Sequence, residues 1–419
     1  VGHGDWLAVG WLPGDSSNIG PFGPPGHMLR PFAVAVCVLV VIPIAAGGAP
    51  APDDQLIVTP PPNEYITVGP PATDAMASGP MDLGTTLALQ HDGAATRIDQ
   101  FVLVNRLDDV RSSAARDRLV IGYAVAANRR IVDLWDRRAT ARTRFRNGSM
   151  DAARYLRELA VIDARAGQVR LTAPVVEELE GTEANTIQRR LETRVIGLEG
   201  PVTGAADAAL RGERAPVTVY LRSSAEGTVL GMMDEGTYLR EAYRADSRTL
   251  GQSGPIGLSE VFDEILPQHY AETRNRSTGS QVQQFSGRDL IAVRFQLSGG
   301  SVETYVDSDT RAPFFEIHRY ENPAAFDPDA PTVTTANGSL RLTITRTITG
   351  GPLKLTTTAN ATGQPVRGNI VMQGMSYRTT ADGVVWTVLP PGQQFTVRAV
   401  ARGGRVSLTI RPLEPTQIT

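Results

Sequence analysis

The stretch TTADGVVWTVLPPG, residues 379–392, combines a turn, a short strand and a second turn. Asp382-Gly383 is a dipeptide that readily reverses the chain, and Pro390-Pro391-Gly392 closes the next turn. Between the turns apolar and polar side chains alternate, so Val385 and Val388 or their neighbours should face a core. No residue of the stretch is suited to chemistry. We therefore interpret it as one hairpin of a scaffold.

Similar short runs occur on both sides of this stretch. They read SLRLTITRTI, PLKLTTT, PVRGNIVMQ, MSYRT, QFTVRAVA and RVSLTIRP, and turn residues such as Gly-Gly and Gly-Gln-Pro separate them. With GVVWTVL they make seven alternating strands, as a β-sandwich requires. The sequence predicts a C-terminal seven-stranded β-sandwich over residues 330–413, joined through the linker ENPAAFDPDAP to the part before it.

Residues 214–322 mix strands with one helix. The predicted strands include PVTVYL, GTVLGMM, TYLREAY, DLIAVRFQL, SVETYVD and PFFEIHRY, giving an antiparallel sheet of about five strands. LSEVFDEILPQHYAE predicts a helix capped by Ser259, and the polar segment 273–288 predicts a loop. We expect an α+β domain here, so the whole chain is predicted to be an α+β multidomain protein.

Residues 83–200 have the periodicity of helices. Within 108–146, apolar residues recur every three or four positions, and Asn147-Gly148 ends the pattern. A second helix follows from Asp151, and a third is predicted to be capped near Thr182. Because the first connection is short, the first two helices should lie antiparallel, as an N-terminal helical hairpin or bundle.

The N-terminal part resembles a targeting sequence. Residues 28–51 contain Arg30, an apolar run and an Ala49-Pro50-Ala51 pattern, which is the layout of a cleaved signal peptide. Residues 1–27 precede this leader, and we interpret them as a mis-called start. Residues 52–82 are rich in Pro and Gly and predict a linker. We therefore expect an extracellular or cell-surface protein that contacts a membrane only through an uncleaved leader.

Composition excludes several classes of function. The formal net charge of −3 gives no global attraction to nucleic acid, and export would remove most nucleic acid from reach. Cys37 is the only cysteine and lies inside the apolar run, so the mature chain has no disulfide or thiolate chemistry. Lys354 is the only lysine among 41 basic residues, which is typical of a GC-rich genome.

The sequence offers no catalytic constellation and no nucleotide-binding motif. Asp307 and Asp309, in VDSDTR, are the candidate ligands for calcium in an extracellular setting, and no other metal or cofactor is predicted. The alternative is that this segment is a hairpin turn, where Asp is favoured because its side chain bonds its own backbone. Four Asn-X-Ser/Thr sequons predict glycosylation, at Asn147, Asn275, Asn337 and Asn360.

Two features of the sequence resemble known groups of proteins. GQPVRGNIVMQGMSYRTTADGVVWTVLPPGQQFTVRAVARGG, residues 363–404, resembles the carboxypeptidase regulatory-like, transthyretin-like sandwich domains, which are non-catalytic attachments. The order of NGSMDAARYLRELAVIDARAGQV, GTYLREAY and SLRLTITRTITGGPLKL is similar to a group of haloarchaeal secreted proteins of unknown function. These resemblances imply architecture and location and imply no activity.

The sequence therefore predicts an exported, non-enzymatic envelope or extracellular protein that acts through binding or structural contact. Its expected partner is an envelope protein or a polysaccharide. One alternative is a hydrolase or peptidase-associated protein with a carboxylate site in residues 214–322; convergence of Glu303, Asp307 and Asp309 in one buried pocket would favour it. Another is an accessory sensor subunit that uses the helical hairpin, which an exposed Ile131 or Trp135 would indicate.

Overall fold

The computed structural model describes residues 7–9, 65–79, 81–177, 190–250, 254–285, 289–402 and 404–413, with side chains for all of these except residues 7–9 and 172–177. The described residues belong to one compact unit, formed by Val1–Val9 and Pro60–Thr419. The predicted signal peptide at 28–51 lies outside the described residues. So do most of residues 1–27, the beginning of the linker and the predicted cap at Thr182.

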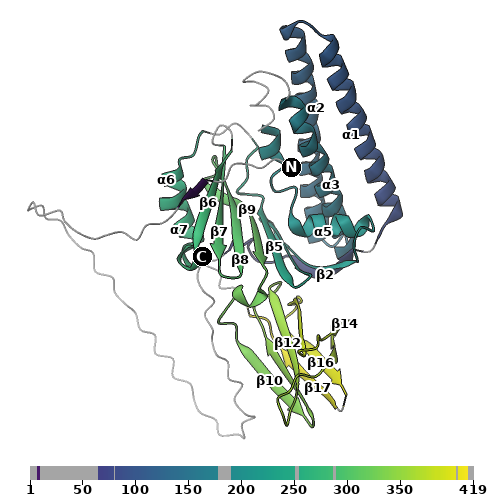
Figure 1. Cartoon of the computed structure of the whole chain (residues 1–419), viewed down its shortest axis with the longest axis vertical. Coiled ribbons are helices and arrows are strands. Elements are labelled where there is room, and N and C mark those ends of the chain that lie inside the picture. Colours follow the sequence, from purple (N-terminus) through teal and green to yellow (C-terminus); the bar gives the residue numbers. More distant parts are fainter. Residues whose placement is uncertain are drawn as a thin grey trace, which may run out of the picture. The chain divides into compact units, whose positions relative to one another are not determined.

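Several helices precede the main run of strands in the described part of the chain, where residues 190–195 are also helical (Figure 1). The helices with described bounds are α1 (Leu83–Asp109), α2 (Ser113–Arg146), α3 (Ala152–Glu177) and α5 (Pro201–Leu210). The side chain of Asp82 begins α1 by accepting a hydrogen bond from the Thr85 backbone nitrogen at 3.0 Å. The helices expected over 108–146 and from Asp151 form as α2 and α3, with Asn147 ending α2.

One antiparallel sheet of nine strands lies at the centre of the described residues. Its order is β1-β6-β7-β8-β9-β5-β4-β3-β2. The strands are β1 (Leu7–Val9), β2 (Thr73–Gly79), β3 (Val217–Ser223), β4 (Gly227–Asp234), β5 (Thr237–Arg244), β6 (Gly279–Gln284), β7 (Leu290–Leu297), β8 (Gly300–Asp307) and β9 (Ala312–Tyr320).

The prediction of about five strands was too low. Strand β6 forms inside the segment 273–288 that was expected to be a loop, because Ser280 and Val282 alternate inward while its glutamines face outward. Strand β2 forms inside the predicted linker 52–82, where small residues pair with β3. Each strand has only one large apolar residue, Met76 in β2 and Val282 in β6, so the sequence signal for a strand is weak.

Different helices cover the two faces of this sheet. On one face, α3 and α5 pack Leu156 and Val202 against Val219 and Leu230. On the other face lie short helices: α6 (Leu258–Glu260), the π-helix η1 (Val261–Ile265), α7 (Leu266–His269) and α8 (Ala271–Arg276). The single helix expected here is therefore interrupted, and Gly257 occupies the N-cap position assigned to Ser259. The helices of residues 83–200 thus share their core with the sheet.

The C-terminal part forms a β-sandwich from two four-stranded sheets, in the orders β10-β11-β12-β15 and β14-β13-β16-β17. A short 3-10 helix, η3 (Pro323–Ala325), lies before the first sheet. The strands of the sheets are β10 (Thr332–Asn337), β11 (Leu340–Thr345), β12 (Pro352–Ala359), β13 (Gly368–Met372), β14 (Met375–Arg378), β15 (Val384–Val388), β16 (Phe395–Ala401) and β17 (Gly404–Ile410).

The sandwich confirms the predicted architecture but corrects two of its details. The described residues form eight strands rather than seven, because the threonine-rich β10 pairs with β11 without burying an apolar side chain. The stretch at 379–392 is also not a hairpin. Asp382-Gly383 carries the chain from one sheet to the other, since β14 pairs with β13 while β15 pairs with β12.

The sandwich and the nine-stranded sheet touch at a small junction. Val388 of β15 is buried in the same apolar cluster as Tyr220 and Tyr238 of the sheet. The Tyr238 hydroxyl donates a hydrogen bond to the Gly350 carbonyl at 2.8 Å. Within the described residues, no helix has both the length and the apolar character of a membrane span.

Candidate functional site

Asp307, the first calcium candidate, lies at the end of β8 and is 1% exposed. One carboxylate oxygen accepts hydrogen bonds from the backbone nitrogens of Asp309 and Thr310, at 3.0 and 3.1 Å. The other accepts from the Arg248 guanidinium at 2.8 Å and from the Thr249 nitrogen at 3.3 Å. Donors from the chain therefore occupy both oxygens, in the pattern of an Asp that closes a turn.

The other carboxylates of this region have different partners. Asp309 is exposed on the turn between β8 and β9. Glu303 pairs with Arg294 on the neighbouring strand and accepts a hydrogen bond from Tyr305. The convergence of Glu303, Asp307 and Asp309 that would favour a hydrolase is not observed. Among the described residues no group of three or more His, Cys, Asp or Glu side chains is placed to hold a metal ion.

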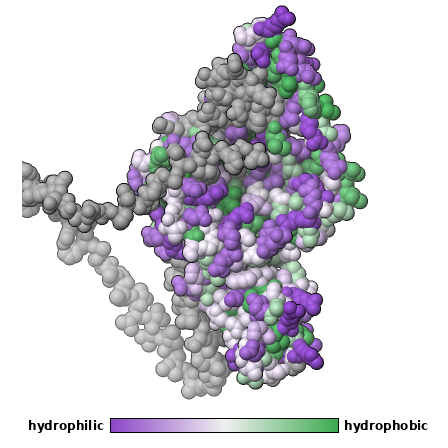
Figure 2. Space-filling view, viewed as in Figure 1, coloured by the Kyte–Doolittle hydropathy of each residue, from purple (hydrophilic) through white to green (hydrophobic). Residues whose placement is uncertain are grey.

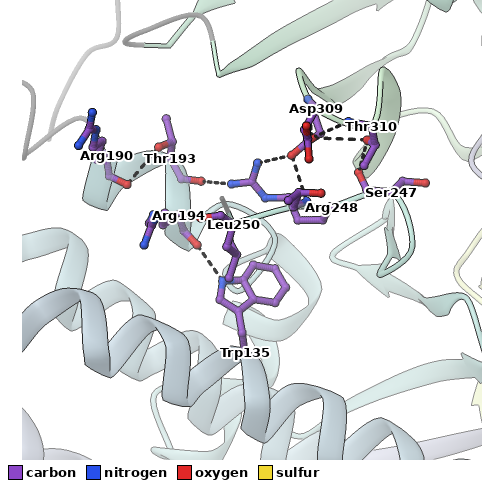
Figure 3. Close-up of polar contacts among 11 residues, drawn as sticks. Trp135, Arg190, Thr193, Arg194, Ser247, Arg248, Leu250, Asp309 and Thr310 are labelled. Carbon is purple, nitrogen blue, oxygen red and sulfur yellow. Dashed lines mark hydrogen bonds and ion pairs between the residues drawn. The ribbon is translucent and has the colours of Figure 1, made fainter. Parts of the chain in front are cut away.

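Arg248 links the helical layer to this turn (Figure 3). Besides its pair with Asp307, its guanidinium donates to the Thr193 carbonyl at 2.9 Å and lies 4.5 Å from the centre of the Phe314 ring. The Thr310 hydroxyl donates to the Ser247 carbonyl at 2.8 Å. Arg248 is 6% exposed on its side chain, so this is a buried ion pair whose partners all belong to the chain.

Arg194 and Trp135 extend this junction into the helices. The Trp135 indole nitrogen donates to the Arg194 carbonyl at 2.9 Å, and the Arg194 guanidinium donates to the Leu250 carbonyl at 2.7 Å (Figure 3). Trp135 is 8% exposed and Ile131 is 0% exposed. The partner surface that an exposed Ile131 or Trp135 would have indicated is therefore buried inside the molecule.

A second polar cluster, on the opposite face of the sheet, was not found by sequence reasoning. Glu316 and His318 of β9, Arg240 of β5 and Tyr270 between α7 and α8 are all nearly inaccessible to solvent. Glu316 contacts the Arg240 guanidinium, the His318 ring at 2.6 Å and the Tyr270 hydroxyl at 2.7 Å. Their spacing along the chain is not that of a known motif, so no local signal marks them.

The charges in this cluster fix its protonation. Burial alone raises the pKa of Glu316, but the nearby His318 and Arg240 outweigh that effect and lower the pKa to about 2. Burial lowers the pKa of His318, against the opposing effect of the Glu316 carboxylate. Arg240 is the partner of Glu316 that stays charged at any ordinary pH.

The segment Tyr65–Val68 closes this cluster from outside the sheet. The Ile66 backbone nitrogen donates to Glu316 at 2.7 Å, and Arg240 donates to the Ile66 carbonyl at 2.9 Å. The Tyr65 ring lies 4.9 Å from the Arg240 guanidinium carbon. The ion pair thus anchors a segment inside the predicted linker 52–82, and its partners are again groups of the chain itself.

Two carboxyls with raised pKa values lie at the beginning of α5. Glu241 of β5 accepts hydrogen bonds from the Val202 and Thr203 backbone nitrogens, the latter at 3.2 Å. Asp163 of α3 accepts from the Gly200 nitrogen at 2.8 Å and from the Thr203 hydroxyl at 2.7 Å. Burial raises the pKa of each to about 7, against the opposing effect of these hydrogen bonds. They join α3, α5 and the sheet.

The sequons differ in how their amides are placed. The Asn147 side chain is exposed, and its oxygen accepts hydrogen bonds from the Ser149 nitrogen at 3.1 Å and hydroxyl at 2.7 Å. Asn275 is exposed on α8. The Asn337 amide nitrogen donates to the Arg405 carbonyl at 3.1 Å, and that of Asn360 donates to the Gly338 carbonyl at 3.2 Å.

Three family models match successive segments of the chain. Residues 28–215 match a domain of unknown function (DUF7096), and residues 219–324 match a family of unknown function (DUF7094). Residues 331–408 match the archaeal fibronectin-III type-like domain. No curated protein and no solved structure shows significant similarity to the chain. The matches support an archaeal origin and a C-terminal fibronectin-III-like sandwich.

Proposed function

We propose that this chain is an exported, non-enzymatic protein of an archaeal cell envelope or its surroundings, acting through binding or structural contact. The proposal rests on one observation, which is that the partners of the buried carboxylates are groups of the chain itself. Asp307 and Glu316 are each held by an arginine and by backbone donors of the chain, which makes both clusters structural junctions. They join helices, sheet and an N-terminal segment into a scaffold.

Two features support the proposed export: the leader-like sequence at 28–51 and the resemblance to haloarchaeal secreted proteins. The resemblance of residues 363–404 to carboxypeptidase regulatory-like domains fits the same role, since such sandwiches are non-catalytic attachments. The proposed partner is an envelope protein or a polysaccharide.

Mass spectrometry of the native protein, from culture medium and from washed envelopes, tests this proposal. We expect an N-terminal peptide that begins near residues 47–52 and recovery in the envelope or medium fraction. A chain that keeps an intact Met28 terminus and remains in the cytoplasmic fraction would contradict it.

The sequon geometry gives a further expectation for an exported protein. Glycosylation takes place on the amide nitrogen, which Asn147 leaves unused because its contacts engage the oxygen. At Asn337 and Asn360 the nitrogen is engaged with a backbone carbonyl. We predict a higher glycan occupancy at Asn147 than at Asn337 or Asn360, measured on glycopeptides of the native protein. Ser149→Thr should retain the glycan and Ser149→Ala should abolish it; a bare Asn147 beside a fully occupied Asn337 would contradict the prediction.

A further inference from the structure

Helix α1 is apolar on two opposite faces. Leu89, Leu103 and Leu107 are buried against the neighbouring helices. On the outward side Leu87 is 65% exposed, Ile98 62% and Phe101 69%. Figure 2 shows hydrophobic residues at the edge of the molecule formed by the helical region. A helix that is apolar on both sides is normally covered on both sides, and a contiguous exposed apolar patch marks an interaction site.

The outward face of α1 carries few charged residues. Between residues 83 and 104 the fully charged side chains are Asp92, Arg97 and Asp99. Asp92 is paired with Arg165 of α3 at 2.7 Å, and Asp99 with Arg130 of α2 at 2.8 Å. The outward face is therefore left with Arg97. One cation is too few for adsorption to anionic lipid, which takes a polar face rich in Lys and Arg.

We propose that this face binds the same face of a second copy of the chain, with the two α1 helices antiparallel. The outward residues recur at intervals of three and four, which is the spacing of a helix-pairing seam: Gly84, Leu87, His91, Ala94, Ile98 and Phe101. In a dimer with two-fold symmetry each contact occurs twice, so the same row of residues can form both sides of the interface.

Side-chain size selects the antiparallel arrangement. If the two-fold axis passes between residues 92 and 93, Leu87 lies opposite Ile98 and the large Phe101 lies opposite the exposed Gly84. His91 then lies opposite the small Ala94. A parallel pair in register would instead place Phe101 against Phe101 and Gly84 against Gly84, which overfills one end of the contact and leaves a void at the other.

The size of the contact sets its strength. A seam of this length extends over about 30 Å of helix, so a single helix pair buries less than the standard interface of roughly 800 Å² per partner. We therefore expect a weak dimer, with a dissociation constant on the order of micromolar. Because the contact is apolar, sulfate should strengthen it.

Sedimentation equilibrium of the purified chain tests the proposal. The wild type should show a reversible monomer–dimer equilibrium, and Phe101→Glu should weaken association at least about tenfold. Leu171→Glu is the matched control, since Leu171 of α3 is also 65% exposed but lies off the seam; it should leave the equilibrium unchanged. Circular dichroism checks that both variants are folded. A monomer at all concentrations, or an equal effect of the two variants, would overturn the proposal.

The orientation has its own test, in a Cys37→Ser background so that each added cysteine is alone. Leu87→Cys and Ile98→Cys chains are mixed and oxidised with oxidised glutathione. The antiparallel seam predicts a disulfide between the two different chains, and much less between two chains of the same kind. Preferential linkage between identical chains would indicate a parallel pair and would overturn the proposed geometry.

Discussion

At the residue scale, Asp307, one of the two calcium candidates, forms a buried ion pair with Arg248. Asp307→Asn retains the shape and the turn but leaves the Arg248 charge buried without a counter-charge. Breaking a buried pair in this way costs about 3–5 kcal/mol, so we expect a loss of that size in the free energy of unfolding, measured by chemical denaturation.

The neighbouring Asp309 supplies the control for this experiment. It is exposed, so Asp309→Asn should change stability by no more than about 0.5 kcal/mol. The double variant Arg248→Met/Asp307→Asn should recover part of the loss, because no uncompensated charge remains. Millimolar calcium should not raise the midpoint of the wild type. A clear calcium-dependent stabilisation that Asp307→Asn abolishes would instead support calcium binding at Asp307.

At the scale of elements, the junction of α5 with the sheet should make stability depend on pH. The pKa of Glu241 is raised by burial from 4.5 to about 7 in the folded chain. The folded chain therefore binds the Glu241 proton more tightly than the unfolded chain does. The resulting contribution to stability is fully present below the pKa of the unfolded chain and is lost as the pH rises through the pKa of the folded chain. We expect the free energy of unfolding to fall by about 3 kcal/mol between pH 5 and pH 8 on account of this group.

Glu241→Gln tests the predicted fall of stability with rising pH. The amide oxygen can still accept hydrogen bonds from the Val202 and Thr203 nitrogens, but the side chain cannot ionise. The variant should have a flatter stability profile over the same pH range, with a residual slope from Asp163, whose pKa is raised in the same direction. Glu264→Gln, at an exposed position of η1, should leave the profile unchanged. An unaltered slope in Glu241→Gln would show that another group causes the pH dependence.

The elements that sequence reasoning found are those whose side chains alternate or recur strongly. The periodic apolar residues of α2 and α3, and the strands from β11 to β17, fall in this class. The elements it missed include the helices α1 and α5 and the strands β2, β6 and β10. The residues of these strands are small, glutamine-rich or threonine-rich, and the strands depend on pairing with a neighbour. The Arg240–Glu316 cluster was missed because 76 residues separate its partners, and only the sheet brings them together.

At the scale of the whole molecule, the described residues join the sandwich to the nine-stranded sheet through a turn at Gly350. This glycine has a φ of +82°, and a Cβ placed on it would lie 2.4 Å from the Tyr220 ring. Its carbonyl also accepts the Tyr238 hydrogen bond, so a small displacement breaks a polar and an apolar contact together. The junction therefore depends on the absence of a side chain at one position.

Gly350→Ala should consequently separate the unfolding of the sandwich from that of the sheet. Gly363→Ala is the matched control, because Gly363 has a φ of +70° but a Cβ there would meet no atom within 4 Å. Both variants incur the backbone cost of about 1–2 kcal/mol, while Gly350→Ala adds about 1–3 kcal/mol from overpacking against Tyr220. Scanning calorimetry should show one cooperative transition for the wild type and for Gly363→Ala, and two for Gly350→Ala. Equal effects of the two substitutions would mean that the Tyr220 and Tyr238 contacts do not couple the sandwich to the sheet, and that the two parts are held together elsewhere.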